Sequence, residues 1–129
     1  MKLLKLIYIS HGWYMEMASA PLIRNKIEAW KYGPVIPDVY SAFRGQGIDV
    51  AQQLPGFSPN VDGYTENILE QIYSSYGNLS AMKLSEITHV PGGPWDSASS
   101  RWGYFAPITN DIIVDHYRAK RQEHLRQNG

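Results

Sequence analysis

The chain contains no cysteine among its 129 residues. This absence excludes disulfide bonds, zinc sites built on thiolates and cysteine nucleophiles, and it is typical of proteins from a reducing compartment. We therefore expect a cytoplasmic protein. An excess of charge of one sign is also lacking, because twelve basic residues balance twelve acidic ones. A strong nonspecific nucleic-acid binder needs a basic excess to displace counterions, so the composition argues against nucleic acid as a partner.

Long hydrophobic runs are absent as well. The apolar stretch at residues 3–9 is too short to cross a bilayer and is interrupted by Lys5. The chain is nevertheless 43% hydrophobic and 19% charged, a composition typical of globular proteins. Its length suits one core and it shows no internal repeat. We predict a single domain over residues 1–129 with no membrane association.

The motifs of common enzymes are missing. There is no Gly-x-Ser-x-Gly elbow that would expose a strained serine nucleophile. The pair Gly92-Gly93 is followed by Pro94 and lacks the lysine of a phosphate-binding loop. We predict no catalytic residues, no cofactor and no enzymatic activity.

Four histidines are the remaining candidates for chemistry: His11, His89, His116 and His124. His116 and His124 lie two helical turns apart, which is not the spacing of a metal-binding pair. His11 stands alone on an apolar helix, where a hydrogen-bonded imidazole is expected. We predict no metal site, although a small metal-dependent enzyme that uses His11 or His89 is the weakest of the alternatives kept open.

Apolar periodicity predicts a mainly α fold, a compact single-domain helical bundle with a small two-stranded β-ribbon around residues 22–32. The first helix should span residues 1–18 and occupy the centre of the core, because it is apolar around much of its circumference. Its main apolar stripe comprises Leu3, Leu6, Ile7, Ser10, Tyr14 and Met17. Leu22 and Ile23 are expected to begin the ribbon, with Asn25-Lys26 as the turn into residues 27–32.

Further helices are marked by their ends. Pro37 suits the first turn of a helix that stops near Gly45, and residues 48–63 are typical of a surface loop. Gly77 is predicted as a left-handed helix cap. Ser80 is predicted to begin another helix through its hydroxyl.

Two later features complete the predicted fold. Residues 91–95 form a corner that leads into a single helical turn ending at Ser99. Thr109 should cap the last helix, which runs from Asn110 into the basic end of the chain.

Aromatic residues make up 12% of the chain, and many fall at corners. Trp30 and Trp95 are expected to fill gaps where helices meet. Trp102, Tyr104 and Phe105 lie in a loop rich in Ser and Gly, and Trp and Tyr are favoured anchors in interfaces. We predict that these three residues contact a protein partner.

The basic end of the chain is a second candidate contact. Arg118 and Arg121 are the residues of this stretch that we predict as possible contacts with a partner. Such a stretch is usually a solvated helix terminus that complements the helix dipole, but it can also meet an acidic partner.

Several segments, in the same order along the chain, resemble the Panacea domain, the SocA-like antitoxin family that also includes phage-associated proteins. The most specific is the run Ile-Glu-Ala-Trp-Lys-Tyr-Gly-Pro-Val at residues 27–35. The others are residues 2–9, Gly12-Trp13, Pro21-Leu22, Pro37, Tyr40, Tyr76-Gly77, residues 79–81, Leu84-Ser85, Thr88-His89 and Pro94-Trp95.

The resemblance implies a mostly helical antitoxin that neutralises a toxin by direct binding. Members of the family are paired with unrelated toxins, including toxic small alarmone synthetases, and SocA-like members are linked to the delivery of a toxin to a bacterial protease. A proteolytic adaptor is therefore the main alternative. A motif shared by members with different toxins is expected to maintain the fold; its residues are Trp30, Tyr32, Gly33, Pro34, Pro37, Tyr40, His89 and Trp95.

Overall fold

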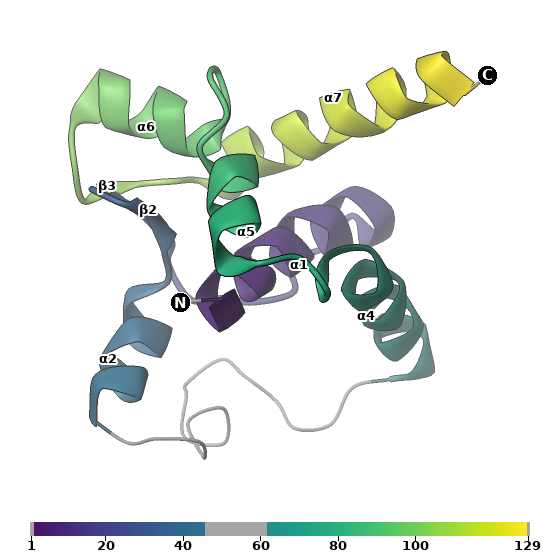
Figure 1. Ribbon diagram of the computed structural model, residues 1–129, viewed down its shortest axis with the longest axis horizontal. Helices are drawn as coiled ribbons and strands as arrows, with labels where there is room; N and C mark the ends of the chain where they lie inside the picture. The colour runs from purple at the N-terminus through teal and green to yellow at the C-terminus, as the bar shows by residue number, and fades with distance from the viewer. Residues whose placement is uncertain (1, 46–61, 129) are drawn as a thin grey trace.

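The computed structural model describes residues 2–45 and 62–128, so the predicted surface loop at 48–63 lies almost entirely outside the described residues. Helices dominate this part of the chain (Figure 1). They are α1 (Lys2–Ala18), α2 (Pro37–Gly45), α4 (Gly63–Tyr76), α5 (Ala81–Thr88), α6 (Pro94–Trp102) and α7 (Asn110–Asn128). The strands are β1 (Glu28–Trp30), β2 (Gly33–Val35) and β3 (Ala106–Pro107). The prediction of a mainly α fold with a small sheet is confirmed.

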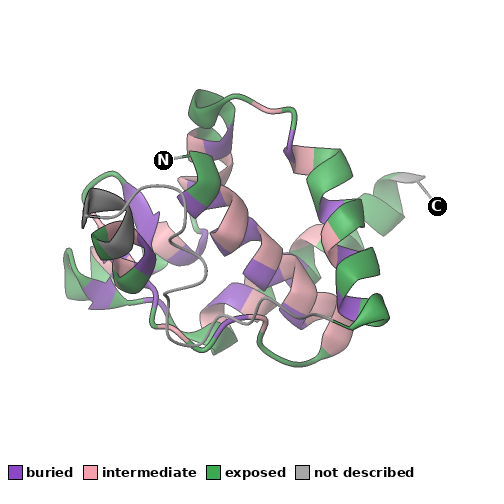
Figure 2. Cartoon of the chain, turned by 90° about the horizontal axis from the view of Figure 1, so that it is seen from below, coloured by how far each residue is buried: buried purple, intermediate pink, exposed green. Residues whose placement is uncertain are grey.

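Helix α1 is the centre of the molecule, as predicted. It packs against α4, α5, α7 and β2, and buried residues follow it along its length (Figure 2). The predicted stripe is wrong in its rotation, because Leu3 is 49% exposed whereas Lys5 and His11 are buried. A helix that is apolar on most sides does not define one inward face by its periodicity, so its neighbours decide the rotation.

One of these neighbours is Tyr117 on α7. A Cβ atom placed on Gly12 would overlap the Tyr117 ring, and Tyr117 and Ile113 are both buried. The absence of a side chain at Gly12 therefore allows α7 to lie close against α1. The hydrophobic core is built around this contact and includes Leu4, Ile9 and Met15 of α1.

The sheet differs from the predicted ribbon. Strand β1 pairs antiparallel with β2, with Trp30 opposite Gly33, and β3 pairs with the other edge of β1, with Ala29 opposite Ala106. The turn is therefore at Lys31 and Tyr32, and not at Asn25-Lys26 as predicted. Gly33 explains the turn, because its φ of 129° is a conformation that L side chains rarely adopt.

The helix ends confirm some predictions and correct others. The Ser80 hydroxyl accepts a hydrogen bond from the Lys83 N–H at 3.1 Å, as an N-cap should. Gly77 follows α4, but its φ of −63° is right-handed, so the predicted left-handed cap is wrong. Helix α6 continues to Trp102 instead of ending after one turn at Ser99.

The N-terminal ends of α4 and α7 are also defined by hydrogen bonds. Asp62 caps α4, since its carboxylate accepts from the Thr65 N–H at 2.7 Å; this cap was not predicted. Thr109 precedes α7, and its backbone carbonyl accepts from the Ile113 N–H. Within residues 2–45 and 62–128, no helix combines the length and apolar character that a membrane crossing requires.

The contact between Gly12 and Tyr117 gives a first prediction. Gly12→Ala should lower the free energy of unfolding by about 1–3 kcal/mol, because the added methyl group forces α1 and α7 apart. Gly63→Ala is the matched control, since nothing lies within 4 Å of the position its Cβ would occupy. Urea denaturation of both variants measures the difference. Equal stabilities would show that the helices are not in close contact at this point.

Candidate partner-binding surface

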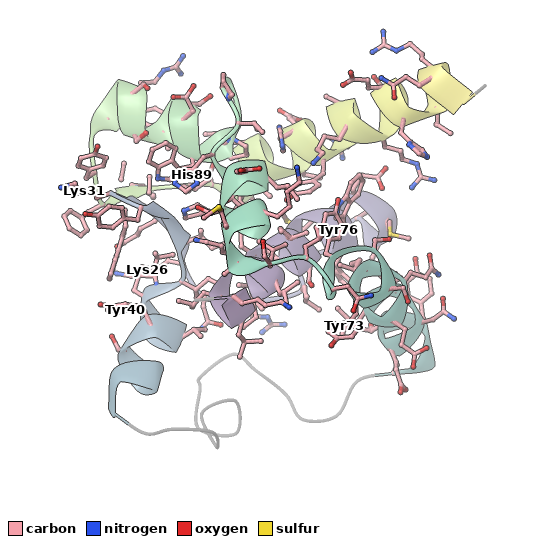
Figure 3. The ribbon with its side chains drawn as sticks, in the orientation of Figure 1. Lys26, Lys31, Tyr40, Tyr73, Tyr76 and His89 are labelled. Carbon is pink, nitrogen blue, oxygen red and sulfur yellow. The ribbon has the colours of Figure 1, made fainter. Side chains whose placement is uncertain are left out.

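Exposed aromatic side chains gather where the sheet ends. Because β3 pairs with β1, the loop before β3 lies beside the β1–β2 turn, and the Phe105 N–H donates to the Ala29 carbonyl at 2.7 Å. We call the exposed rings of this region the aromatic edge: Tyr32 (72% exposed), Trp102 (57%), Tyr104 (56%) and Phe105 (64%). Figure 3 shows Lys31 in the turn at this end of the molecule. Large exposed rings grouped in this way are typical of a binding surface.

The backbone holds the loop in an unusual conformation. Gly103 has a φ of 89°, and Phe105, which is not a glycine, has a φ of 69°. A bulky residue with positive φ is uncommon, and its conformational cost must be offset by the surrounding structure. Here the offset includes the hydrogen bond to Ala29 and an edge-to-face contact with Trp30, with ring centroids 5.5 Å apart.

The inner side of the edge is a layer of half-buried rings. The Trp95 Nε1–H donates to the Trp30 carbonyl at 2.7 Å, and the Trp30 Nε1–H donates to Glu28 at 2.9 Å. Trp30 also meets Tyr40 with ring centroids 4.9 Å apart, and Trp95 meets His89 at 4.5 Å. The structure thus brings together most of the residues predicted to maintain the fold. Tyr32 is the exception, because it lies exposed in the turn and belongs to the aromatic edge.

The two arginines predicted as contacts lie elsewhere. Arg118 forms a salt bridge with Asp115 at 3.6 Å, and Arg121 forms one with Glu16 of α1 at 3.0 Å. Both are on the part of α7 that runs away from α6 and β3 (Figure 1). They do not join the aromatic edge. The edge reaches α7 instead through a groove of about 410 Å³ that Trp102, Arg101 and His116 help to line.

His11 is buried and both of its ring nitrogens are occupied. Nδ1 accepts a hydrogen bond from the Ile23 N–H at 3.3 Å, so in the neutral ring Nε2 carries the proton and donates to Asn110 Oδ1 at 2.9 Å. Burial lowers the pKa of His11, which the bond to Asn110 partly offsets. With both nitrogens engaged, His11 has no lone pair for a metal. The described residues contain no group of three or more potential metal ligands.

An unexpected pair of polar side chains lies under β2. Lys5 is only 6% exposed and makes no hydrogen bond or ion pair with any described residue. A Cβ atom on Gly33 would be 3.6 Å from Lys5 Nζ and 3.2 Å from His89 Nε2, so both nitrogens flank this glycine. The Nδ1 of His89 lies 2.6 Å from the Ser85 carbonyl and donates to it, which leaves Nε2 facing Gly33.

Burial lowers the pKa of Lys5. A buried lysine without a partner is rare. Its only sign in the sequence is a lysine within an otherwise apolar stretch, where a charge is expected to interrupt the apolar run and not to be buried.

Comparison with known proteins places these features in a family context. The family model described as "Antitoxin SocA-like, Panacea domain" matches residues 3–96. The chain is 32% identical over 132 residues to Antitoxin SocA of Caulobacter vibrioides (strain NA1000 / CB15N), covering 91% of this chain and 70% of the relative. No solved structure matches the chain. The family match contains all of α1 except Lys2 and the whole β1–β2 turn, but it ends before Trp102.

The position of His11 predicts loss of stability in acid. Its folded-state pKa is below the ordinary value, so the unfolded chain binds the proton more readily. The free energy of unfolding should therefore fall as pH drops below about 6.5, by about 1–2 kcal/mol, since a protonated Nδ1 cannot accept from Ile23. Urea denaturation at pH 7.5 and pH 5 measures the change. Between these two pH values, the free energy of unfolding should fall less in His11→Gln than in the wild type. In His124→Gln, which changes an exposed histidine, it should fall as much as in the wild type. Equal falls in the wild type and both variants would show that His11 is not the source of the acid sensitivity.

Substitution of Lys5, in contrast, is expected to stabilise the protein. Lys5→Met should raise the free energy of unfolding at pH 7 by about 1–2 kcal/mol, because it removes an ammonium whose charged form burial disfavours and which pairs with no described residue. Since the folded-state pKa is lowered, the wild type should gain stability as pH rises toward about 10, and the difference should then shrink. Thermal denaturation at pH 7 and pH 10 tests both points. A less stable Lys5→Met at pH 7 would show that the ammonium is satisfied in the folded protein.

Proposed function

The chain belongs to the Panacea-domain family of SocA-like antitoxins, and on that premise we propose that it neutralises a cognate protein toxin by binding it directly. The observation that carries the proposal is the aromatic edge. Four large rings are more than half exposed there, on the end of α6, the loop before β3 and the β1–β2 turn. A hydrogen bond to Ala29 and a ring contact with Trp30 fix Phe105 in place. Rigid aromatic side chains supply contact area at little cost in conformational entropy, which is why Trp and Tyr dominate the energetics of many interfaces.

Three of the four rings of the edge lie outside the family match, which supports a role of these three in partner choice; Tyr32 lies within it. Trp102, Tyr104 and Phe105 follow the last matched residue, whereas the layer beneath them, with Trp30, is within the match. A common inner layer can hold an outer loop that differs between proteins with different toxins. Arg118 and Arg121 are proposed as a separate and weaker contact, because each is already engaged in a salt bridge.

Neutralisation by masking needs no catalytic group in the antitoxin. The toxin is inhibited as long as its own functional surface is covered, and affinity alone sets the effect. A proteolytic adaptor would instead release the toxin to a protease, so the toxin would disappear with time. The two mechanisms therefore differ in toxin lifetime and not in whether a complex forms.

The proposal predicts that Trp102→Ala/Tyr104→Ala weakens the complex with the protein encoded by the neighbouring gene by at least tenfold. Truncation of two interface anchors commonly costs more than about 1–2 kcal/mol each. Isothermal titration of the purified proteins measures the affinity, and co-expression measures relief of growth arrest. Phe105 is left intact because its ring packs on Trp30.

Tyr73→Ala is the matched control, since Tyr73 is 65% exposed on α4, away from the edge (Figure 3). It should bind and protect like the wild type. If the wild type forms no complex and does not relieve growth arrest, the proposed function is wrong. If the complex forms but the toxin half-life shortens when the antitoxin is present, the adaptor mechanism replaces masking.

A further inference from the structure

A groove runs between three helices on another side of the molecule from the aromatic edge. Helices α4 and α7 both pack on α1 but diverge from each other (Figure 1). The space between them is about 370 Å³. It is lined by Trp13 and Met17 of α1, Gln71, Ile72, Ser75 and Tyr76 of α4, and Lys120 and His124 of α7.

The floor of the groove offers apolar surface because its polar atoms are already paired with each other. The Trp13 Nε1–H donates to the Tyr76 hydroxyl at 2.9 Å, and Tyr76 lies on the side of α4 that faces α1 (Figure 3). Trp13 is further fixed by an edge-to-face contact with Tyr117, with centroids 4.9 Å apart. Met17 and Ile72 complete the floor. A ligand placed here would meet ring faces and methyl groups.

The α7 wall of the groove is cationic. None of the described residues that line the groove is acidic. Lys120 has no hydrogen bond or salt bridge to any described residue, and its Nζ lies 5.7 Å from the centre of the Tyr117 ring. Burial lowers the pKa of Lys120, and Glu123 offsets only part of that effect. A negatively charged group beside Nζ would therefore be stabilised more than at an ordinary surface lysine.

We propose that this groove binds a small apolar carboxylic acid, with its hydrocarbon body against Trp13, Met17 and Ile72 and its carboxylate at Lys120 Nζ. The volume selects the size class, since pockets for small molecules begin at roughly 300 Å³. A docked helix is about 10–12 Å wide with its side chains, and one turn of it already occupies more than the roughly 370 Å³ of this groove. The proposal goes beyond toxin neutralisation and does not rest on it.

The methionines allow a site-specific test with decanoate as the probe. Met17 lines the groove, whereas Met82 is 75% exposed on α5 and serves as an internal control. In protein labelled with ¹³C at the methionine methyl groups, decanoate should shift the Met17 signal saturably and leave Met82 unchanged. 1-Decanol has the same chain without the charge and should bind at least tenfold more weakly. Equal binding of the two probes, or equal shifts at Met17 and Met82, would overturn the proposal.

Two variants test the chemistry of the wall and the shape of the groove. Lys120→Met keeps the aliphatic stem and should weaken decanoate binding about tenfold, the effect of losing one charge-assisted hydrogen bond. Lys83→Met removes an exposed lysine of α5 and should change nothing. Ser75→Trp should fill the groove and abolish binding, and circular dichroism checks that each variant is folded.

Unchanged decanoate affinity in folded Lys120→Met or Ser75→Trp contradicts the assigned site. The variants also separate a small ligand from a protein segment. If the wild type does not bind decanoate while Ser75→Trp prevents the complex with the neighbouring gene product, the groove is part of a protein interface and the proposal is wrong. If decanoate binds and the toxin complex never forms, the groove proposal stands and the proposed function fails.

Discussion

The close approach of α7 to α1 at Gly12 is the constraint on which the rest of the structure depends. Tyr117 occupies the space that any larger residue at position 12 would need. This contact sets the rotation of α1, because the face that meets Tyr117 must lie inward. Once that face is fixed, Leu4, Tyr8 and Ile9 enter the core and Leu3 is left in solvent. Protein interiors pack to crystal-like density, so one missing side chain can determine how two helices meet.

The same rotation brings polar groups inside. Lys5, Tyr8 and His11 all lie on the buried side of α1, and the Tyr8 hydroxyl has no hydrogen-bond partner among the residues that the structure describes. An unsatisfied buried hydroxyl costs about 1–3 kcal/mol. Such costs are large against a total stability of roughly 5–15 kcal/mol for a domain. The core therefore gives up stability at α1, where burial also disfavours the charged form of Lys5.

The helices and their starts could be predicted from the sequence better than the pairing and packing of these elements with one another. Pro37 and Ser80 mark helix starts through local chemistry, and both starts are correct. The small sheet was predicted and β1 lies in the predicted range, but its partners were wrong. The pairing of β1 with β3 joins residues about eighty positions apart and leaves no local sign. Gly33 did carry a sign, since a glycine in an aromatic strand indicates a turn or a close approach. Trp102, Tyr104 and Phe105 were predicted as exposed rings from their loop, but their meeting with the β1–β2 turn follows from that long-range pairing.

The core and the aromatic edge are coupled through His11. Its imidazole holds Ile23 on one side and Asn110 on the other, at 3.3 Å and 2.9 Å. Ile23 precedes β1 by five residues and Asn110 follows β3 by three. His11 of the central helix thus anchors the chain just before β1 and just after β3, the two strands that bring the exposed rings together. A buried hydrogen-bonded group of this kind contributes little net stability, but it fixes one arrangement of the segments it joins. The positions of the exposed rings are therefore determined in part from inside the core, by a residue that no partner could touch.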